Sequence, residues 1–114
     1  MNEKMQIQLY FFLFSILSSL RADTFYVPGD FSSIQNAINV ASNSDSILVW
    51  PGLYEENLDF DGKEIVVSSL YFIANDSLLI ESTVLDADEN GSVVSFASGE
   101  SNESILQGFT IQNG

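Results

Sequence analysis

The residues with the clearest capacity for chemistry are carboxylates gathered in a predicted turn at residues 86–91, Asp-Ala-Asp-Glu-Asn-Gly. Asp86, Asp88 and Glu89 offer hard oxygen ligands of the kind that Ca²⁺ prefers. A sparser acidic group comprises Glu55, Glu56, Asp59, Asp61 and Glu64. Neither group has the spacing of a Ca²⁺-binding loop, so solvated turn carboxylates are the favoured interpretation. Ca²⁺ at Asp86, Asp88 and Glu89 is the alternative, and no cofactor is expected otherwise.

Groups that could transfer a proton near neutral pH are scarce. The sequence contains no histidine and no cysteine, and beyond residue 22 its one basic residue is Lys63. Lys63 lies in a Gly-Lys turn, where a structural role is expected. We therefore predict no catalytic residue in this chain. Without cysteine, an exported domain must also rely on its apolar core rather than on disulfides.

Aromatic residues could stack on sugar rings. The candidates are Trp50, Tyr54, Tyr71 and Phe72. The favoured alternative for Trp50 and Tyr54 is structural: they flank the turn formed by Pro51 and Gly52, and are expected to pack beneath a helix. On this interpretation Trp50, Pro51, Gly52 and Tyr54 all have structural roles.

The helix that would cover them is predicted from four apolar residues at positions i, i+3, i+4 and i+7, namely Ile34, Ala37, Ile38 and Ala41. Ser32 and Gln35 have the spacing of a capping box at its start. Turn-forming residues 43–45 predict its end after about three turns. One apolar stripe cannot sustain such a helix alone, so it must lie on a core.

Short strands are predicted on both sides of this helix. Residues 24–27 are β-rich, and residues 46–50 form a continuous apolar run, as expected of a strand buried on both faces. Ile47, Ile65 and Val84 follow one another at nearly equal intervals along the sequence, which suggests a regular coil. This pattern favours a parallel β-solenoid, plugged at its N-terminal mouth by the helix, over an antiparallel sandwich.

Residues 1–22 have the layout of a signal peptide, with Lys4, an apolar segment at 9–17 and Ala22 before the expected cleavage point. An uncleaved N-terminal anchor is the alternative. The domain at 23–114 would then carry 15 acidic residues and one basic residue, a net charge of −14. This charge argues against nucleic acid and anionic membranes as partners. We expect a secreted or cell-surface protein that does not insert into a membrane once the signal is removed.

A long run of residues carries a family resemblance. It comprises Val27-Pro28, Asp30-Phe31, Ile34-Gln35, Ala37-Ile38, Ala41, Asp45, Ile47, Val49, Pro51-Gly52, Tyr54, Glu56, Gly62-Lys63, Ile65, Ser68 and residues 108–114. It resembles the opening of right-handed parallel β-helix proteins of the pectin-lyase-like superfamily. The resemblance implies an all-β, right-handed parallel β-helix with an N-terminal amphipathic capping helix, incomplete at its C-terminus. The catalytic aspartates, arginine and glutamines of pectinesterases have no counterpart here.

Three functions remain open. The first is a non-catalytic N-terminal segment of a secreted β-helix protein that interacts with extracellular polysaccharide. The second is the opening of a carbohydrate-active enzyme, a pectinesterase or polysaccharide lyase, whose active site lies downstream. The third is a structural or adhesive surface protein.

Several smaller expectations concern the turns and the end of the chain. Asn75, Asn90 and Asn102 each lie in an Asn-x-Ser sequon, the acceptor sequence for N-glycosylation. Asn113 is expected to start a ladder of stacked asparagines. The chain is expected to be a fragment of a longer protein; if it is complete, end-to-end self-association through open strand edges is expected.

Overall fold

The computed structural model describes residues 21–114, so residues 1–20 of the predicted signal peptide lie outside the described residues. In the described part, no helix is long and apolar enough to cross a membrane. The described chain is rich in strands, which confirms the predicted β-rich class. Its elements are β1 (Thr24–Val27), α2 (Ile34–Val40), β2 (Ser46–Val49), β3 (Gly52–Glu55), β4 (Leu58–Asp59), β5 (Val66–Ser69), α3 (Tyr71–Ala74), α4 (Leu78–Ser82), β6 (Thr83–Asp86), β7 (Val94–Ser95), β8 (Ile105–Gln107) and β9 (Thr110–Gln112).

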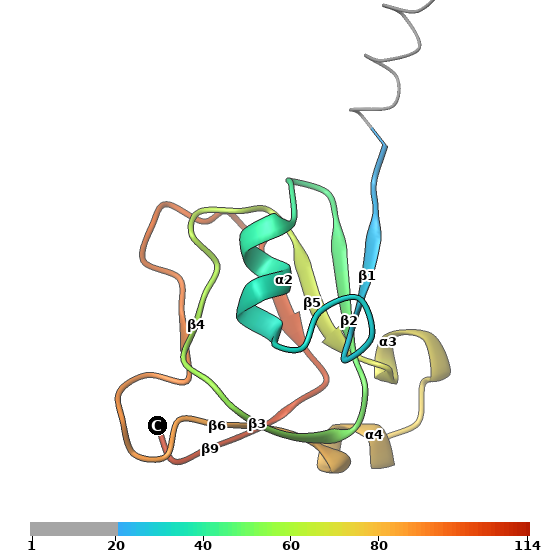
Figure 1. Ribbon diagram of the computed structural model, residues 1–114, viewed down its shortest axis with the longest axis vertical. Helices are drawn as coiled ribbons and strands as arrows, with labels where there is room; N and C mark the ends of the chain where they lie inside the picture. Colours follow the sequence, from blue (N-terminus) through green and yellow to red (C-terminus); the bar gives the residue numbers. More distant parts are fainter. Residues whose placement is uncertain (1–20) are drawn as a thin grey trace, which may run out of the picture.

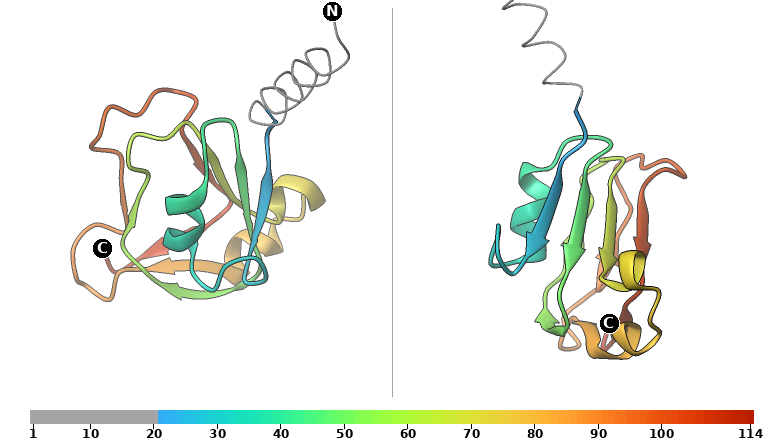
Figure 2. Two further views of the ribbon diagram at one scale, coloured as in Figure 1. Left: turned by 45° about the horizontal axis from the view of Figure 1, so that its top comes forward. Right: turned by 90° about the vertical axis from the view of Figure 1, so that its right-hand side faces the viewer.

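The strands form three small sheets in which every pairing is parallel. The first sheet has the order β1-β2-β5-β8, the second β3-β6-β9 and the third β4-β7. From β2 onward the chain visits the sheets in turn, and each return places a new strand beside the earlier one (Figure 1). Seen from the side, the four strands of the first sheet stand in a row, with β1 and α2 at one end and β8 at the other (Figure 2).

The returns are unequal in length, so the prediction of a regular coil with Ile47, Ile65 and Val84 at equal intervals is wrong. In the first sheet Ile47 pairs with Val67, and Val67 pairs with Leu106 after a return nearly twice as long. Val84 does not continue this sheet; it pairs with Leu53 in the second sheet. The longer return contains helices α3 and α4 and two loops, at 87–93 before β7 and at 96–104 after it, and the apolar pattern did not predict these insertions.

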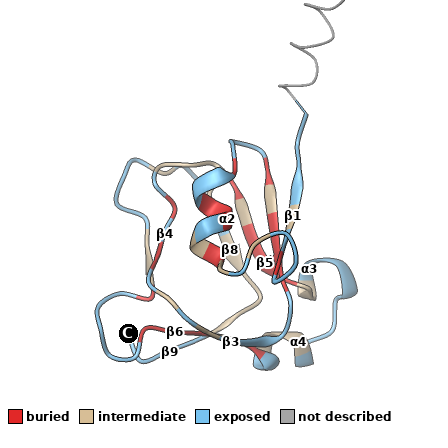
Figure 3. Cartoon of the chain, in the orientation of Figure 1, coloured by how far each residue is buried: buried red, intermediate tan, exposed pale blue. Residues whose placement is uncertain are grey.

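The core lies between the sheets, and strand alternation selects its members. Ile47 and Val49 are fully buried, as the apolar run predicted. Leu58 in the third sheet, Leu85 in the second and Phe60 just after β4 close the core. Figure 3 shows the buried residues concentrated on the inner sides of the strands and on one side of α2.

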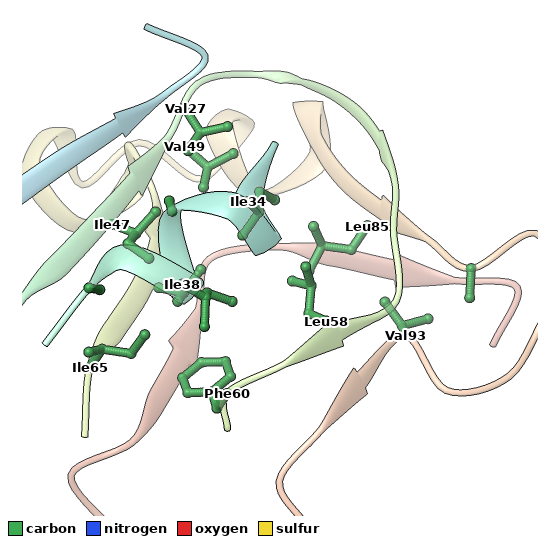
Figure 4. Packing of buried hydrophobic residues seen from close by; sticks show 14 residues of the cluster. Val27, Ile34, Ile38, Ile47, Val49, Leu58, Phe60, Ile65, Leu85 and Val93 are labelled. Atoms are coloured by element: carbon green, nitrogen blue, oxygen red, sulfur yellow. The ribbon is translucent and has the colours of Figure 1, made fainter. Parts of the chain in front are cut away.

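Helix α2 contributes its predicted stripe to this core. Ile34, Ala37 and Ile38 are fully buried, and Ala41 is nearly so. Figure 4 shows Ile34 and Ile38 pointing into the apolar cluster that contains Phe60. The helix spans 7 residues rather than the three turns expected, because the chain is already extended at Ala41.

The predicted capping box is wrong. The N-cap is Ser33, which has extended backbone angles and whose hydroxyl accepts a hydrogen bond from the Asn36 amide at 3.2 Å. Ser32 makes no such contact. The Gln35 side chain instead spans to the next coil, where it accepts from the Asp59 amide (2.8 Å) and donates to the Asp59 carbonyl (3.0 Å).

Two charged side chains from the following coil hold the ends of α2. The Glu56 carboxylate accepts hydrogen bonds from the first two helical amides, each at 3.0 Å. The Lys63 ammonium donates to the carbonyls of Ile38 (2.7 Å) and Asn39 (2.9 Å). An anion at the N-terminus and a cation at the C-terminus both oppose the helix dipole. We call this pair the α2 clamp.

Candidate functional site

Trp50 is exposed, which corrects the prediction that it packs beneath the helix. Half of its surface is accessible, at the corner between β2 and β3. Ile47 and Val49 point inward and Trp50 points outward, as does the buried Leu48; unlike Leu48, Trp50 lies past the end of β2. Its amide is nevertheless fixed by a hydrogen bond to the Val27 carbonyl at 2.8 Å. An aromatic ring is thereby presented to solvent on a rigid backbone.

Tyr54 takes the inward direction from β3 and packs against the core, in agreement with its predicted structural role. Its hydroxyl donates to the Trp50 carbonyl at 2.7 Å. Burial raises the pKa of the Tyr54 hydroxyl, and the Glu56 carboxylate raises it further. Pro51 and Gly52 form the exposed turn between the two aromatic residues. Tyr54 thus ties down the corner from which Trp50 projects.

The remaining aromatic candidates lie elsewhere, on the short helix α3. Tyr71 is half-buried and Phe72 is exposed. In the side view, α3 lies over the outer side of the first sheet near β5 (Figure 2). The structure therefore does not bring the four aromatic candidates into one site.

The outer side of the second sheet carries two rows of side chains, one near the Trp50 corner and one at the C-terminal end of β3. Register places Leu53, Val84 and Thr110 in one row, and Glu55, Asp86 and Gln112 in the other. Leu53 and Glu55 are exposed, and Gln112 is exposed on β9. We call the exposed residues Trp50, Leu53, Glu55 and Gln112 the Trp50 surface. It combines an aromatic platform and an apolar side chain with carboxylate and amide groups.

Asp86 lies between Glu55 and Gln112 in the second row and is nevertheless almost completely buried. One carboxylate oxygen accepts from the side-chain amides of Gln112 (2.9 Å) and Asn113 (3.0 Å), and the other accepts from the Asp88 backbone amide at 2.7 Å. The Gln112 amide, then the Asp88 amide, holds the pKa of Asp86 below its ordinary value. The group is therefore ionised at neutral pH and serves as a hydrogen-bond acceptor rather than as a proton donor.

The candidate Ca²⁺ ligands are not drawn together. Asp88 and Glu89 lie in an exposed turn with left-handed backbone angles, φ of 52° and 58°, while both oxygens of Asp86 serve the hydrogen bonds described above. In residues 21–114, no three His, Cys, Asp or Glu side chains form a group able to hold a metal ion. In the sparser acidic group, Glu56 belongs to the α2 clamp.

Three polar residues have roles that the sequence reasoning missed. Asn57 donates to the carbonyls of Asn90 (2.8 Å) and Ser92 (2.8 Å), which joins β4 to the loop before β7. Gln112 and Asn113 both donate to Asp86, so Asn113 contacts a carboxylate rather than a stacked asparagine. The signal for Gln112 was present: it alternates with the apolar Ile111, which indicates an outward position on a strand.

Comparison with known proteins adds no relative: no family model, no curated protein and no solved structure matches this chain.

Proposed function

We propose that residues 23–114 form the N-terminal segment of a secreted right-handed parallel β-helix, with α2 as its cap, and that this segment binds extracellular polysaccharide without catalysing a reaction. The parallel pairing in three sheets, visited in turn, supports the fold. The resemblance to the pectin-lyase-like superfamily supports it independently. The position of α2 at one end of the row of strands supports the capping role (Figure 2).

The observation that carries the binding proposal is the exposure of Trp50. An indole ring offers a large apolar face for stacking on a sugar and an N–H donor at its edge. Glu55 and Gln112, on the same outer side of the second sheet, supply an acceptor and an amide for sugar hydroxyls. The Trp50 backbone is held by Val27 and Tyr54, so only its side chain must be ordered on binding.

The charge of the chain selects among polysaccharides. Residues 23–114 carry a net charge of −14, which repels polyanions such as deesterified pectin at low ionic strength. We therefore expect neutral polysaccharides to bind in preference, with acidic ones binding only when a divalent cation or salt reduces the repulsion.

The test is affinity electrophoresis through gels that contain neutral β-glucan, xylan, mannan or polygalacturonate, the last with and without Ca²⁺. Trp50→Ala should abolish the retardation that the wild-type chain shows in the retaining gel. Phe72→Ala removes an aromatic ring of similar exposure from α3 and should leave retardation unchanged. Equal retardation of wild type and Trp50→Ala, or no retardation in any gel, would overturn the proposal. Circular dichroism is the check that each variant is folded.

The enzyme alternative is the less favoured one. Asp86, the most enclosed carboxylate near the Trp50 surface, is ionised and occupied by three hydrogen bonds. A pectinesterase or lyase would require groups that these residues do not supply. We expect no release of methanol or of unsaturated products from pectin; release by the wild type that is lost in Asp86→Asn would establish the alternative.

A further inference from the structure

Seven of the eight asparagines of the described chain fall into two groups, and the exposed Asn36 belongs to neither. In the first, the side-chain amide forms hydrogen bonds that hold loops or strands together; these residues are Asn39, Asn43, Asn57 and Asn113. Asn39, Asn43 and Asn57 are followed two positions later by Ala or Asp, so none of these three lies in a sequon. The asparagines whose side chains form hydrogen bonds are therefore not the asparagines that lie in sequons.

The three sequon asparagines behave differently. Asn75, Asn90 and Asn102 are exposed, and within residues 21–114 none of their side chains forms a hydrogen bond. Each lies in a turn outside the ladders. Asn75 is the left-handed C-cap of α3 with φ of 52°, Asn90 closes a turn with the Ala87 carbonyl (2.9 Å), and Asn102 lies within the turn 101–104. A bulky group on any of these amides meets solvent and displaces no contact of the fold.

We propose that Asn75, Asn90 and Asn102 are N-glycosylation sites, modified when the chain enters a secretory compartment that contains an oligosaccharyltransferase. In this transfer the asparagine Nδ2 forms a bond to the sugar C1 carbon of a lipid-diphosphate-linked oligosaccharide. The bond from C1 to the diphosphate oxygen breaks, the lipid diphosphate leaves, and the amide gives up one proton. The proposal rests on the export that the proposed function includes, and it goes beyond that function.

The site at Asn75 has a further consequence, because its neighbours are apolar and exposed. Phe72, Ile73 and Leu78 are 53%, 62% and 65% accessible, and all lie close to Asn75 in the sequence. Exposed apolar groups of this kind promote association unless they are covered. A glycan on Asn75 is hydrophilic and large enough to cover them, whereas Asn102 has one exposed apolar residue, Ile105 (38% accessible), within three positions and Asn90 has none. The glycan at Asn75 is therefore the one expected to maintain solubility.

The experiment expresses the full chain in a cultured animal cell line, once with its own residues 1–22 and once with these replaced by an established secretory leader. Secreted and cell-retained protein are both treated with peptide-N-glycosidase. We expect three steps of mobility loss for wild type, one fewer for each single Asn→Gln variant, and none for the triple variant. Asn36→Gln changes an exposed asparagine that lies outside a sequon and should leave all three steps.

The two leaders separate the proposal from the export on which it depends. Glycosidase-insensitive wild-type protein with the replaced leader would overturn the three sites. Sensitivity with the replaced leader alone would leave the sites standing and overturn export by residues 1–22. For the role of Asn75, we expect Asn75→Gln to bind an apolar dye several-fold more strongly than Asn102→Gln does; equal binding would overturn that role.

Discussion

Gly108 occupies a position that no other residue type can take without cost. Its φ is +79°, and a Cβ built there would lie 2.5 Å from the Ser69 hydroxyl oxygen and 3.3 Å from the Tyr71 Cβ. The Ser69 hydroxyl also accepts from the Tyr71 amide at 3.2 Å, so it is not free to rotate away. The strand that leads into β9 therefore approaches β5 and α3 closely only because residue 108 lacks a side chain.

We expect Gly108→Ala to lower the free energy of unfolding by about 2–4 kcal/mol, from left-handed strain together with overpacking. Gly99→Ala is the matched control: Gly99 has φ of +82°, but nothing lies within 4 Å of its built Cβ, so strain alone should cost about 1 kcal/mol. Urea unfolding followed by circular dichroism measures both. Equal losses of unfolding free energy in the two variants would show that the close approach to Ser69 adds nothing to the cost of Gly108→Ala.

Asp86 makes the stability depend on pH. Its pKa is lowered in the folded chain, first by the Gln112 amide, so its contribution is complete above the unfolded pKa and is lost as pH falls through the folded pKa. We expect the advantage of wild type over Asp86→Asn in unfolding free energy to be largest at neutral pH and to shrink below about pH 4. A pH-independent difference would contradict this. Carboxyl NMR titration of Gln112→Ala should give a higher pKa for Asp86 than in wild type.

At the scale of elements, α2 is the helix with the most external support. Its apolar stripe packs on the core, and the clamp satisfies groups at both of its ends. A helix of 7 residues is too short to be stable in isolation, so α2 depends on these contacts. The clamp residues come from the coil that α2 covers. We therefore expect α2 and this coil to unfold together.

We expect Lys63→Gln to destabilise the chain by about 1–2 kcal/mol, because it removes a cation that donates to two terminal carbonyls. Amide hydrogen exchange in α2 should accelerate with it. The comparison variant is Glu103→Gln: this exposed carboxylate accepts no hydrogen bond within residues 21–114, and its change should stay within about 0.5 kcal/mol. The two substitutions change the net charge in opposite directions, so similar losses for the two variants would contradict the role of the clamp.

The sequence predicted the positions of α2 and the strands better than it predicted the side-chain contacts that fix them. The stripe at Ile34 and Ile38 was correct because helical periodicity depends only on local spacing. The cap was assigned to Ser32 rather than Ser33, because that choice depends on Gln35 reaching Asp59, a contact absent from local pattern. Trp50 was assigned to the core because the whole apolar run was treated as buried, whereas burial covers Ile47 to Val49 and ends with the strand, before Trp50.

For the whole molecule, the sequence indicated a β-rich chain but not the lengths of its returns. Residues 70–82 are rich in apolar side chains, yet α3 and α4 leave Phe72, Ile73 and Leu78 exposed. Such a segment looks like core in a sequence and cannot be distinguished from a strand of the next coil. The Trp50 surface was similarly hidden, because it joins residues from β3 and β9 that only the register of the second sheet brings together.

The unequal returns also show how tolerant this architecture is of added chain. Val67 and Leu106 pair in the same parallel arrangement as Ile47 and Val67, although the return between them is nearly twice as long. Doubling the length of a flexible loop costs only about 0.6 kcal/mol of closure entropy. A longer connection between two strands therefore destabilises their pairing only slightly. The loop at 97–104, between β7 and β8, is therefore a natural place to graft a foreign peptide epitope, and the molecule is a scaffold whose loops and framework can change separately.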